Sequence, residues 1–236
     1  MSFLKAEWRK LALLNYEISP ALLKDYVPHG TELDHWQDRC YVSMVGFMFE
    51  NVRLLGVKVP YHVNFEEVNL RFYVRRKVNN EWRRGVVFIK EIVPKPAITF
   101  IANTVYKENY ETLPMKHSWE TNNDKFTAEY NWKIASGWQS IKVLAENRLV
   151  PIEVGSEAEF ITEHYWGYAK VSEEKTNEYE VTHPRWKQYP VIGFSSEIDF
   201  EANYGAKFAF LNEATPTSVQ LAEGSEITVE GKQRLG

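Results

Sequence analysis

Residues 64–75 read Asn64-Phe65-Glu66-Glu67-Val68-Asn69-Leu70-Arg71-Phe72-Tyr73-Val74-Arg75. Apolar and polar side chains alternate along this segment, which is the period of a β-strand. The apolar row is Val68, Leu70, Phe72 and Val74, and the polar row is Glu67, Asn69, Arg71, Tyr73 and Arg75. Asn79 and Asn80 follow, and both tolerate the positive φ of a tight hairpin. Residues 85–93 are therefore predicted to return as an antiparallel partner.

Strands dominate the rest of the chain. Residues 40–49 form another apolar strand, and further hairpins are predicted at Asn122-Asn123, Ser136-Gly137 and Glu223-Gly224-Ser225. Helices are few and short. They are predicted from Ser19-Pro20 to Tyr26, after the capping box of Ser156 and Glu159, and over residues 102–110. Turns are evenly spaced and no linker interrupts them, so residues 1–236 are predicted to form a single, mainly β domain with a few short helices, an α+β chain whose antiparallel meander closes on itself.

The composition limits the possible functions. The chain has 236 residues, a net charge of −4, 44% hydrophobic residues, and eight Trp, 13 Tyr and 13 Phe. These values are typical of a soluble globular protein, and the aromatic excess favours β structure. There is no apolar run long enough for a membrane span and no secretory h-region. A single cysteine, Cys40, excludes an intramolecular disulfide. We therefore expect a cytoplasmic protein without a membrane segment, and the lack of a basic block argues against nucleic-acid binding.

Standard cofactor and metal motifs are missing. There is no glycine-rich phosphate loop and no nucleophile elbow, so we expect no cofactor. His29, Asp34, His35 and Asp38 lie close together in the sequence, but their spacing matches no regular ligand geometry. The sequence therefore predicts no metal site.

The polar row of residues 67–73 has two interpretations. In an open sheet the row faces water and contributes only solubility, and this is what the residues alone favour. In a closed barrel the same row faces the lumen, where Glu67 and Arg71 create a polar pocket.

The returning strand carries one ionisable group on each face. Simple alternation places Lys90 with Val86 and Phe88, and Glu91 with Val87 and Ile89. A buried lysine becomes a nucleophile for carbonyl groups, and a buried carboxyl group becomes a proton donor. The alternative, which the residues slightly favour, is that these groups pair across the hairpin with Arg71 or Glu67.

His164 lies in a third cluster, residues 160–168, where a helix is followed by a strand. Beside Glu163 and Thr162 it is a candidate proton shuttle. The more common role for such a histidine is that of a hydrogen-bonded core residue.

Three segments, residues 65–74, 84–94 and 160–168, resemble the YqjF-like family of uncharacterised bacterial proteins, and the resemblance runs from Trp8 to Gly224-Ser225. That family is similar in fold to acetoacetate decarboxylase, a cone-shaped antiparallel β-barrel that encloses its active site. The resemblance implies that the row containing Glu67 faces the lumen.

The resemblance also implies a difference in chemistry. Acetoacetate decarboxylase carries adjacent lysines in a Pro-Lys-Lys-Leu-Ala segment, and the first lysine forms a Schiff base. Glu67 matches a glutamate that lines the cavity of that enzyme. The gapless match sets Asn109-Tyr110-Glu111 against the lysine segment, with Tyr106 at an aromatic position, and a shifted match sets Met115-Lys116 there. The sequence contains no Lys-Lys pair, so a Schiff base activated by a neighbouring lysine is not expected.

Three functions are compatible with these residues. The first is binding of a small organic carboxylate or keto acid in the barrel lumen, with a lyase-like activity if the protein is an enzyme. Its candidate catalytic residues are Glu67, Tyr110 and His164, and its candidate binding residues are Arg71, Tyr73, Lys90 and Tyr106. The second is a Schiff-base decarboxylase that uses Lys90 or Lys116. The third is a noncatalytic binding or assembly protein whose aromatic residues form the interface of a homo-oligomer.

Overall fold

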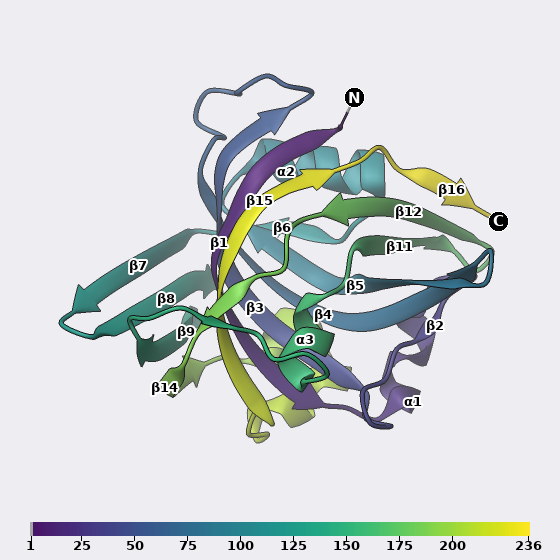
Figure 1. The fold of residues 1–236 in the computed structure, drawn as a ribbon. Helices are drawn as coiled ribbons and strands as arrows, with labels where there is room; N and C mark the ends of the chain where they lie inside the picture. The colour runs from purple at the N-terminus through teal and green to yellow at the C-terminus, as the bar shows by residue number, and fades with distance from the viewer. Residues whose placement is uncertain (1) are drawn as a thin grey trace.

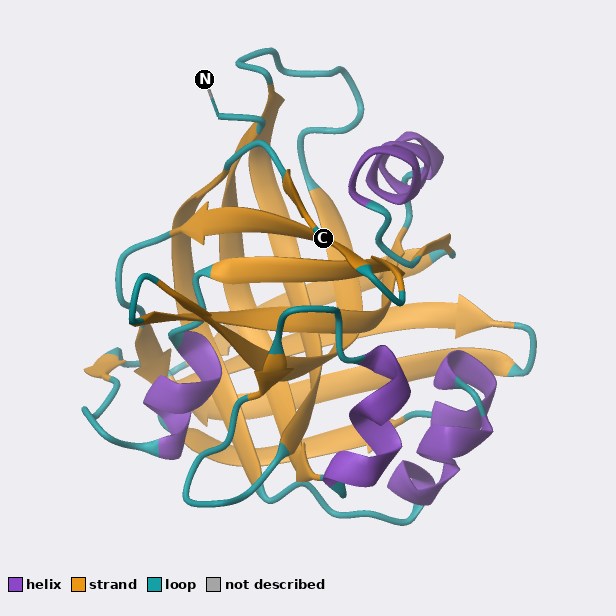
Figure 2. Cartoon of the chain, turned by 90° about the vertical axis from the view of Figure 1, so that its right-hand side faces the viewer, coloured by secondary structure: helices purple, strands orange, loops and turns teal. Residues whose placement is uncertain are grey.

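A closed ring of strands forms the centre of the molecule in the computed structural model, which describes residues 2–236. Going around the ring, the strands are β15 (Ser218–Val229), β1 (Leu4–Glu17), β3 (Tyr41–Leu54), β4 (Phe65–Val78), β5 (Glu81–Val93), β11 (Trp166–Ser172) and β12 (Lys175–Thr182). β12 pairs with β15 through Val181↔Val229 and closes the ring. Neighbours are antiparallel, except that β5 and β11 run parallel. Figures 1 and 2 show the strands wrapping around a common interior, as the barrel prediction requires.

A second sheet extends to one side of the ring (Figure 1). It consists of β14 (Val191–Glu197), β9 (Gly137–Glu146), β8 (Lys125–Ile134) and β7 (Met115–Asn122). Short strands complete the chain: β2 (Glu32–Leu33), β6 (Tyr110–Thr112), β10 (Val150–Pro151), β13 (Lys187–Tyr189) and β16 (Gln233–Leu235). The helices are α1 (Pro20–Leu23), α2 (Pro96–Ile101), α3 (Glu157–Thr162) and α4 (Phe200–Tyr204), with tighter or wider turns over Lys24–Tyr26, Ala102–Tyr106 and Ala206–Asn212. Between residues 2 and 236, none of these helices has the length and apolar character needed to cross a membrane.

The two faces of β4 enter different cores. Leu70 and Phe72 point outward and pack with Tyr130 and Trp132 of the second sheet. The second sheet approaches closely at Gly46, where an added Cβ would lie 2.9 Å from the Tyr130 ring. The other face of β4 points into the ring. From Glu67 to Tyr73 the polar row is therefore buried, and for these residues the lumen interpretation replaces the solvated one, whereas Arg75 at the end of the row stays partly exposed.

A β-bulge in β5 changes which of its residues face inward. Leu70 pairs with Lys90, whereas Arg71 pairs with Phe88, so Ile89 is an extra residue in β5. Glu91 therefore shares the inner face with Phe88, and Lys90 lies outside. This corrects the simple alternation predicted for residues 86–93.

Most predicted turns are confirmed. β4 and β5 are joined at Asn79 and Asn80, both with positive φ, and the turns near Asn123 and Ser136 connect the strands of the second sheet. The hairpin at Gly224 is wrong because β15 continues through it. Gly224 instead adopts φ +79° opposite Arg9, next to the irregularity in the pairing of β1 with β3 between Arg9 and Ala12. A Cβ at Gly224 would lie 1.9 Å from the Trp8 carbonyl oxygen.

The helices agree in part with the sequence. Pro20 opens the first helical segment, which ends at Tyr26, and Ser156 caps α3 by accepting a hydrogen bond from the Glu159 backbone N–H. The helix expected over residues 102–110 begins earlier, at Pro96, and its last turn is a π-turn that ends at Tyr106. Tyr110 already belongs to strand β6.

Candidate functional site

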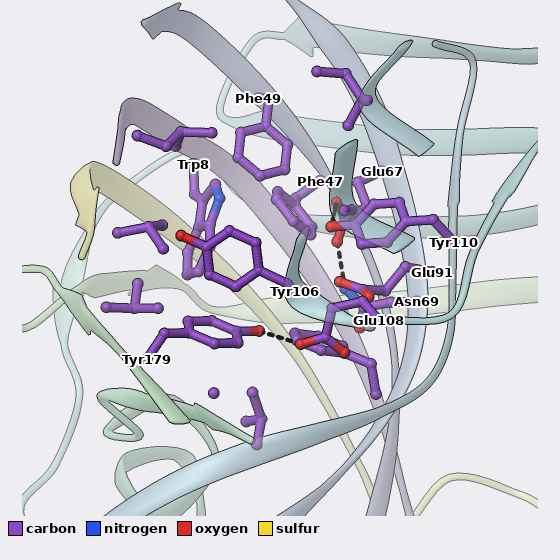
Figure 3. Close-up of a pocket in the computed structure, with 18 of the residues that line it drawn as sticks. Trp8, Phe47, Phe49, Glu67, Asn69, Glu91, Tyr106, Glu108, Tyr110 and Tyr179 are labelled. Carbon is purple, nitrogen blue, oxygen red and sulfur yellow. Dashed lines mark hydrogen bonds between the residues drawn. The ribbon is translucent and has the colours of Figure 1, made fainter. Parts of the chain in front are cut away.

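A cavity of about 180 Å³ lies inside the ring (Figure 3). Most of its lining is apolar, with aromatic rings from several strands: Trp8, Phe47, Phe49, Phe88, Tyr106 and Tyr179. Polar groups come from the inner faces of β4 and β5 and from segments that follow β5. A mostly apolar cavity with a few converging polar groups is the usual form of a small-molecule site.

Three glutamates form an acidic cluster in this cavity. Glu67 and Glu91 are each 2% exposed, and Glu108 lies beside them (Figure 3). Glu67 accepts hydrogen bonds from Asn69 Nδ2 at 2.9 Å and from the Tyr110 hydroxyl at 3.1 Å. The Tyr179 hydroxyl donates to Glu108 Oε1 at 2.7 Å. These hydrogen bonds hold the Glu67 and Glu108 carboxyl groups in place without supplying a cation.

Burial dominates the electrostatics of the cluster. It raises the pKa of Glu67 to about 7, although the Asn69 and Tyr110 hydrogen bonds and the Arg71 charge oppose the shift. Burial also raises the pKa of Glu91 well above its ordinary value, and the charges of Glu108 and Glu67 add to that effect. The pKa of Glu108 is raised for the same reason. The cluster therefore retains protons near neutral pH.

Two asparagines hold the cluster in position. Asn109 Nδ2 donates to the carbonyl of the bulged Ile89 at 2.7 Å, and the Asn109 carbonyl accepts from the Glu91 N–H at 3.0 Å. Asn103 binds both the N–H and the carbonyl of Tyr110, at 2.7 and 2.9 Å. These contacts fix the bulge that points Glu91 inward and the segment that carries Glu108 and Tyr110.

Arg71 lies on the same face of β4 and is 6% exposed. Its guanidinium carbon is 5.8 Å from the centre of the Tyr73 ring. In the described part of the chain, its Nε has no hydrogen-bond partner and its guanidinium forms no ion pair. Because an unpaired buried charge is costly, this arrangement points to a ligand group at Arg71.

His164 lines the cavity near Arg71. Its ring lies 4.7 Å from the Tyr73 ring, and its Nε2 is 3.4 Å from Asp34 Oδ2. Burial lowers the pKa of His164 to about 4 despite the neighbouring Asp34. The imidazole is therefore neutral at pH 7. Its Nε2 lies near Asp34 without meeting hydrogen-bond geometry, and among residues 2–236 neither Nε2 nor Nδ1 has a hydrogen-bond partner.

The structure brings together five of the seven predicted site residues. Glu67, Arg71, Tyr106, Tyr110 and His164 line the cavity. Tyr73 and Lys90 do not line it. The Tyr73 hydroxyl is bonded to Ser43 Oγ at 2.6 Å, and Lys90 Nζ is bonded to Glu111 outside the ring at 3.0 Å. Neither side chain is therefore placed to bind a ligand in the lumen.

Family comparison identifies the family to which this chain belongs. Residues 5–226 match DUF2071, whose description is "Uncharacterized conserved protein (COG2071)". The chain belongs to the DUF2071 family. A comparison with curated proteins finds no match.

Solved structures place this DUF2071 chain among acetoacetate decarboxylase-like folds. It superposes on acetoacetate decarboxylase from Legionella pneumophila with a TM-score of 0.67 and 12% identity, covering 99% of this chain and 87% of the other. The enduracididine biosynthesis enzyme MppR, complexed with pyruvate, gives a TM-score of 0.67 and 10% identity, with coverage of 100% and 91%. An acetoacetate decarboxylase-like enzyme from Sphingomonas wittichii gives a TM-score of 0.62 and 10% identity, covering 100% of this chain and 94% of the other. At these identities the likeness shows the fold.

The DUF2071 site differs from a Schiff-base site in its charged groups. Lys116 lies on the second sheet, with Nζ 4.7 Å from the Trp138 ring, and none of the lysines among residues 2–236 lines the cavity. Sequence reasoning missed Glu108, Tyr179 and Trp8. Glu108 follows an irregular helix end, and Tyr179 belongs to the strand that closes the ring, so no local pattern identifies either residue.

Proposed function

We propose that this protein binds a small organic carboxylate or keto acid inside the ring and exchanges a proton with it. The observation that carries the proposal is the buried Arg71 guanidinium, which has no partner among the described residues and lies at an apolar cavity. A carboxylate fits this group because a guanidinium donates two parallel hydrogen bonds to the two oxygens. Binding would then pair a charge that is unpaired in the free protein.

Glu67 is the proposed proton-exchanging group. A carboxyl group with a pKa near 7 is present in both its protonated and its ionised form at neutral pH. It can therefore donate or accept a proton, because a substantial fraction of the protein holds it in the required form. The Tyr110 hydroxyl orients this group by donating to Oε2. Burial and the neighbouring glutamates raise the pKa of Tyr110 itself, so Tyr110 acts as a fixed donor and not as a base. His164, neutral and near Asp34, is the second proposed proton acceptor.

A Schiff-base mechanism has less support. Lys90 and Lys116 both lie outside the cavity, and Lys90 is paired with Glu111. Borohydride trapping with a 3-keto acid tests this alternative directly. We expect no lysine to gain mass, and a labelled Lys90 or Lys116 would overturn that expectation.

The noncatalytic alternative has one observation in its favour. Two large side chains, Tyr61 and Phe100, are 89% and 70% exposed, and both belong to segments that border the cavity. A subunit interface at this rim would cover them. Light scattering tests this alternative, because an interface of that kind requires an oligomer in solution.

Native mass spectrometry and NMR test the leading proposal together. A panel of linear keto acids whose keto group lies several carbons from the carboxylate is screened for binding, because the Cα atoms of Arg71 and Glu67 are roughly 13 Å apart. Exchange of the hydrogens next to the keto group is followed in D₂O. Arg71→Met is expected to lose binding, whereas Glu67→Gln is expected to bind and lose exchange. Lys90→Met is the matched control, since its amine lies outside the ring.

Two outcomes would contradict the proposal. If keto acids bind the Arg71→Met variant as tightly as they bind the wild-type protein, the ligand carboxylate does not pair with Arg71. If hydrogen exchange next to the keto group continues in the Glu67→Gln variant, Glu67 does not transfer the proton. Thermal unfolding of each variant shows whether a loss reflects the site and not the fold.

A further inference from the structure

The cavity has two chemically opposite ends. Glu67 and Arg71 lie four residues apart on the same face of β4, so their Cα atoms are separated by roughly 13 Å. Glu91 and Glu108 gather at the Glu67 end (Figure 3). At the other end Arg71 is accompanied by His164 and His183, and burial lowers the pKa of both histidines. One end is therefore acidic, and Arg71 is the only cation at the other among the described lining residues.

Unpartnered atoms at the two ends require opposite ligand groups. At the acidic end, Asn69 Oδ1 and Glu91 Oε2 are acceptors without a donor within residues 2–236, and their side chains are 1% and 2% exposed. At the other end, Arg71 Nε is a donor without an acceptor. Buried polar groups are normally hydrogen-bonded. A fitting ligand therefore carries a donor group for the first end and acceptor oxygens for the second.

The charges select the kind of donor. A simple carboxylate would pair with Arg71 but leave three carboxyl groups together in an apolar cavity. A protonated amine provides up to three N–H donors and a positive charge, which suits both the unpartnered acceptors and the acidic cluster. The Tyr110 and Tyr179 hydroxyls, which also face the cluster, already donate to Glu67 and Glu108 and leave Glu91 Oε2 free.

We propose that the ligand is a linear amino carboxylate, with its carboxylate on Arg71 and its ammonium group among Glu67, Glu91 and Glu108. The Arg71 half rests on the proposed function, and the ammonium half is new. The two groups must be separated by several carbons, because the amine and carboxylate of a simple α-amino acid share one carbon and cannot reach both ends. Phe47, opposite Glu67, and Phe88, opposite Arg71, lie beside the path of the connecting methylenes.

Isothermal titration calorimetry at pH 7.5 tests the length and the charge of the ligand. The probes are 4-aminobutanoate, 5-aminopentanoate, 6-aminohexanoate and 8-aminooctanoate, each with the unbranched carboxylate of the same carbon number. We expect one chain length to bind at least about tenfold more tightly than its partner without the amine, because only the amine pairs the buried acceptors. Proton release, measured in two buffers of different ionisation enthalpy, is also expected, since a cation favours ionised carboxyl groups.

Two variants separate this inference from the proposed function. Glu91→Gln is expected to weaken binding of the best amino carboxylate at least about tenfold. It is expected to change the affinity for the plain carboxylate less than about twofold. Arg71→Met is expected to weaken binding of both ligands, and Lys90→Met is expected to weaken binding of neither. Glu67→Gln provides a second removal of charge if Glu91→Gln does not fold, as judged by thermal unfolding.

Each outcome has a distinct meaning. If plain and amino carboxylates bind equally and Glu91→Gln changes neither, the ammonium assignment is overturned while the role of Arg71 stands. If the wild-type protein binds no carboxylate of either series, both the inference and the proposed function are overturned.

Discussion

Buried carboxylates occur in two regions of this protein, and the regions treat them in opposite ways. On β12, Glu178 accepts from Arg76 at 3.0 Å and from Arg83 at 2.9 Å, one guanidinium for each oxygen. Asp34 accepts from Arg84 at 2.6 Å. In the cavity, Glu67 and Glu91 are buried to a similar degree, yet neither forms an ion pair within residues 2–236.

The pKa directions follow from these partners. Burial alone would raise the pKa of Asp34, but the nearby His164 ring and the hydrogen bond and charge of Arg84 outweigh it and leave that pKa below its ordinary value. Burial raises the pKa of Glu67 to about 7 because hydrogen bonds and the Arg71 charge do not compensate for it. Burial of an acid is thus no guide to its role. The partners around the carboxylate distinguish a structural acid from one that is available for ligand or proton.

Removing the paired acid is expected to have the largest effect on stability. Glu178→Ala leaves Arg76 and Arg83 without their carboxylate partner. Both guanidinium groups are partly exposed, so hydration by water offsets part of the lost ion-pair energy. We expect the free energy of unfolding to fall by about 2 to 3 kcal/mol. Chemical denaturation measures this fall, with the exposed Glu174→Ala as control. Equal stability of the two variants would mean that the Glu178 pairs contribute nothing.

The second prediction uses the opposite signs of the two pKa shifts. The raised pKa of Glu67 favours the protonated native state, so stability from this group is present at low pH and is lost as pH rises from about 4.5 through about 7. Glu67→Gln removes this titration and is expected to gain stability on the order of 2 kcal/mol at pH 8, with little gain at pH 4.5.

Asp34→Asn provides the comparison of opposite sign. The lowered pKa of Asp34 stabilises the native state above the ordinary value of 3.8, and this contribution is lost as pH falls through the folded pKa. Asp34→Asn is therefore expected to be less stable than wild type at pH 7. Thermal unfolding between pH 3 and pH 8 measures both variants. Parallel pH profiles for the two would refute the contrast between the regions.

The smallest effect is expected at Lys90. Its ion pair with Glu111 lies on the outer face, and Glu111 is about half exposed, at 46%. Lys90→Met is expected to change the free energy of unfolding by less than about 0.5 kcal/mol. It is also expected to leave carboxylate binding unchanged, as measured by calorimetry. A Lys90→Met variant that folds normally but no longer binds would place this lysine in the site after all.

The sequence predicts the strands far better than it predicts their surroundings. Alternation along residues 65–74 identifies both rows of β4, and Asn79-Asn80 identifies the turn. Which row faces the interior depends on whether the ring closes, and closure is formed by β12 and β15, more than a hundred residues later. Local pattern cannot contain that information, and here the family resemblance supplied it.

The site was predictable only where the strand is regular. Glu67 and Arg71 follow from the period of β4. Glu91 and Lys90 exchange faces because of the bulge at Ile89, and that bulge is held by Asn109, twenty residues further along the chain. Gly224 looks like a turn because glycine favours positive φ, but the structure uses that φ where the strand passes close to the Trp8 carbonyl. In each case a contact distant in sequence overrides a local preference.

The seam between β1 and β15 also affects how the chain folds. Leu4 pairs with Val229 and Asn15 with Ser218, so the first strand finds its second neighbour only after some two hundred intervening residues. Contacts between such distant segments slow folding, because a long loop must close before they stabilise anything. We therefore expect the acids of the cavity to remain hydrated through most of refolding and to lose water only when β1 and β15 pair.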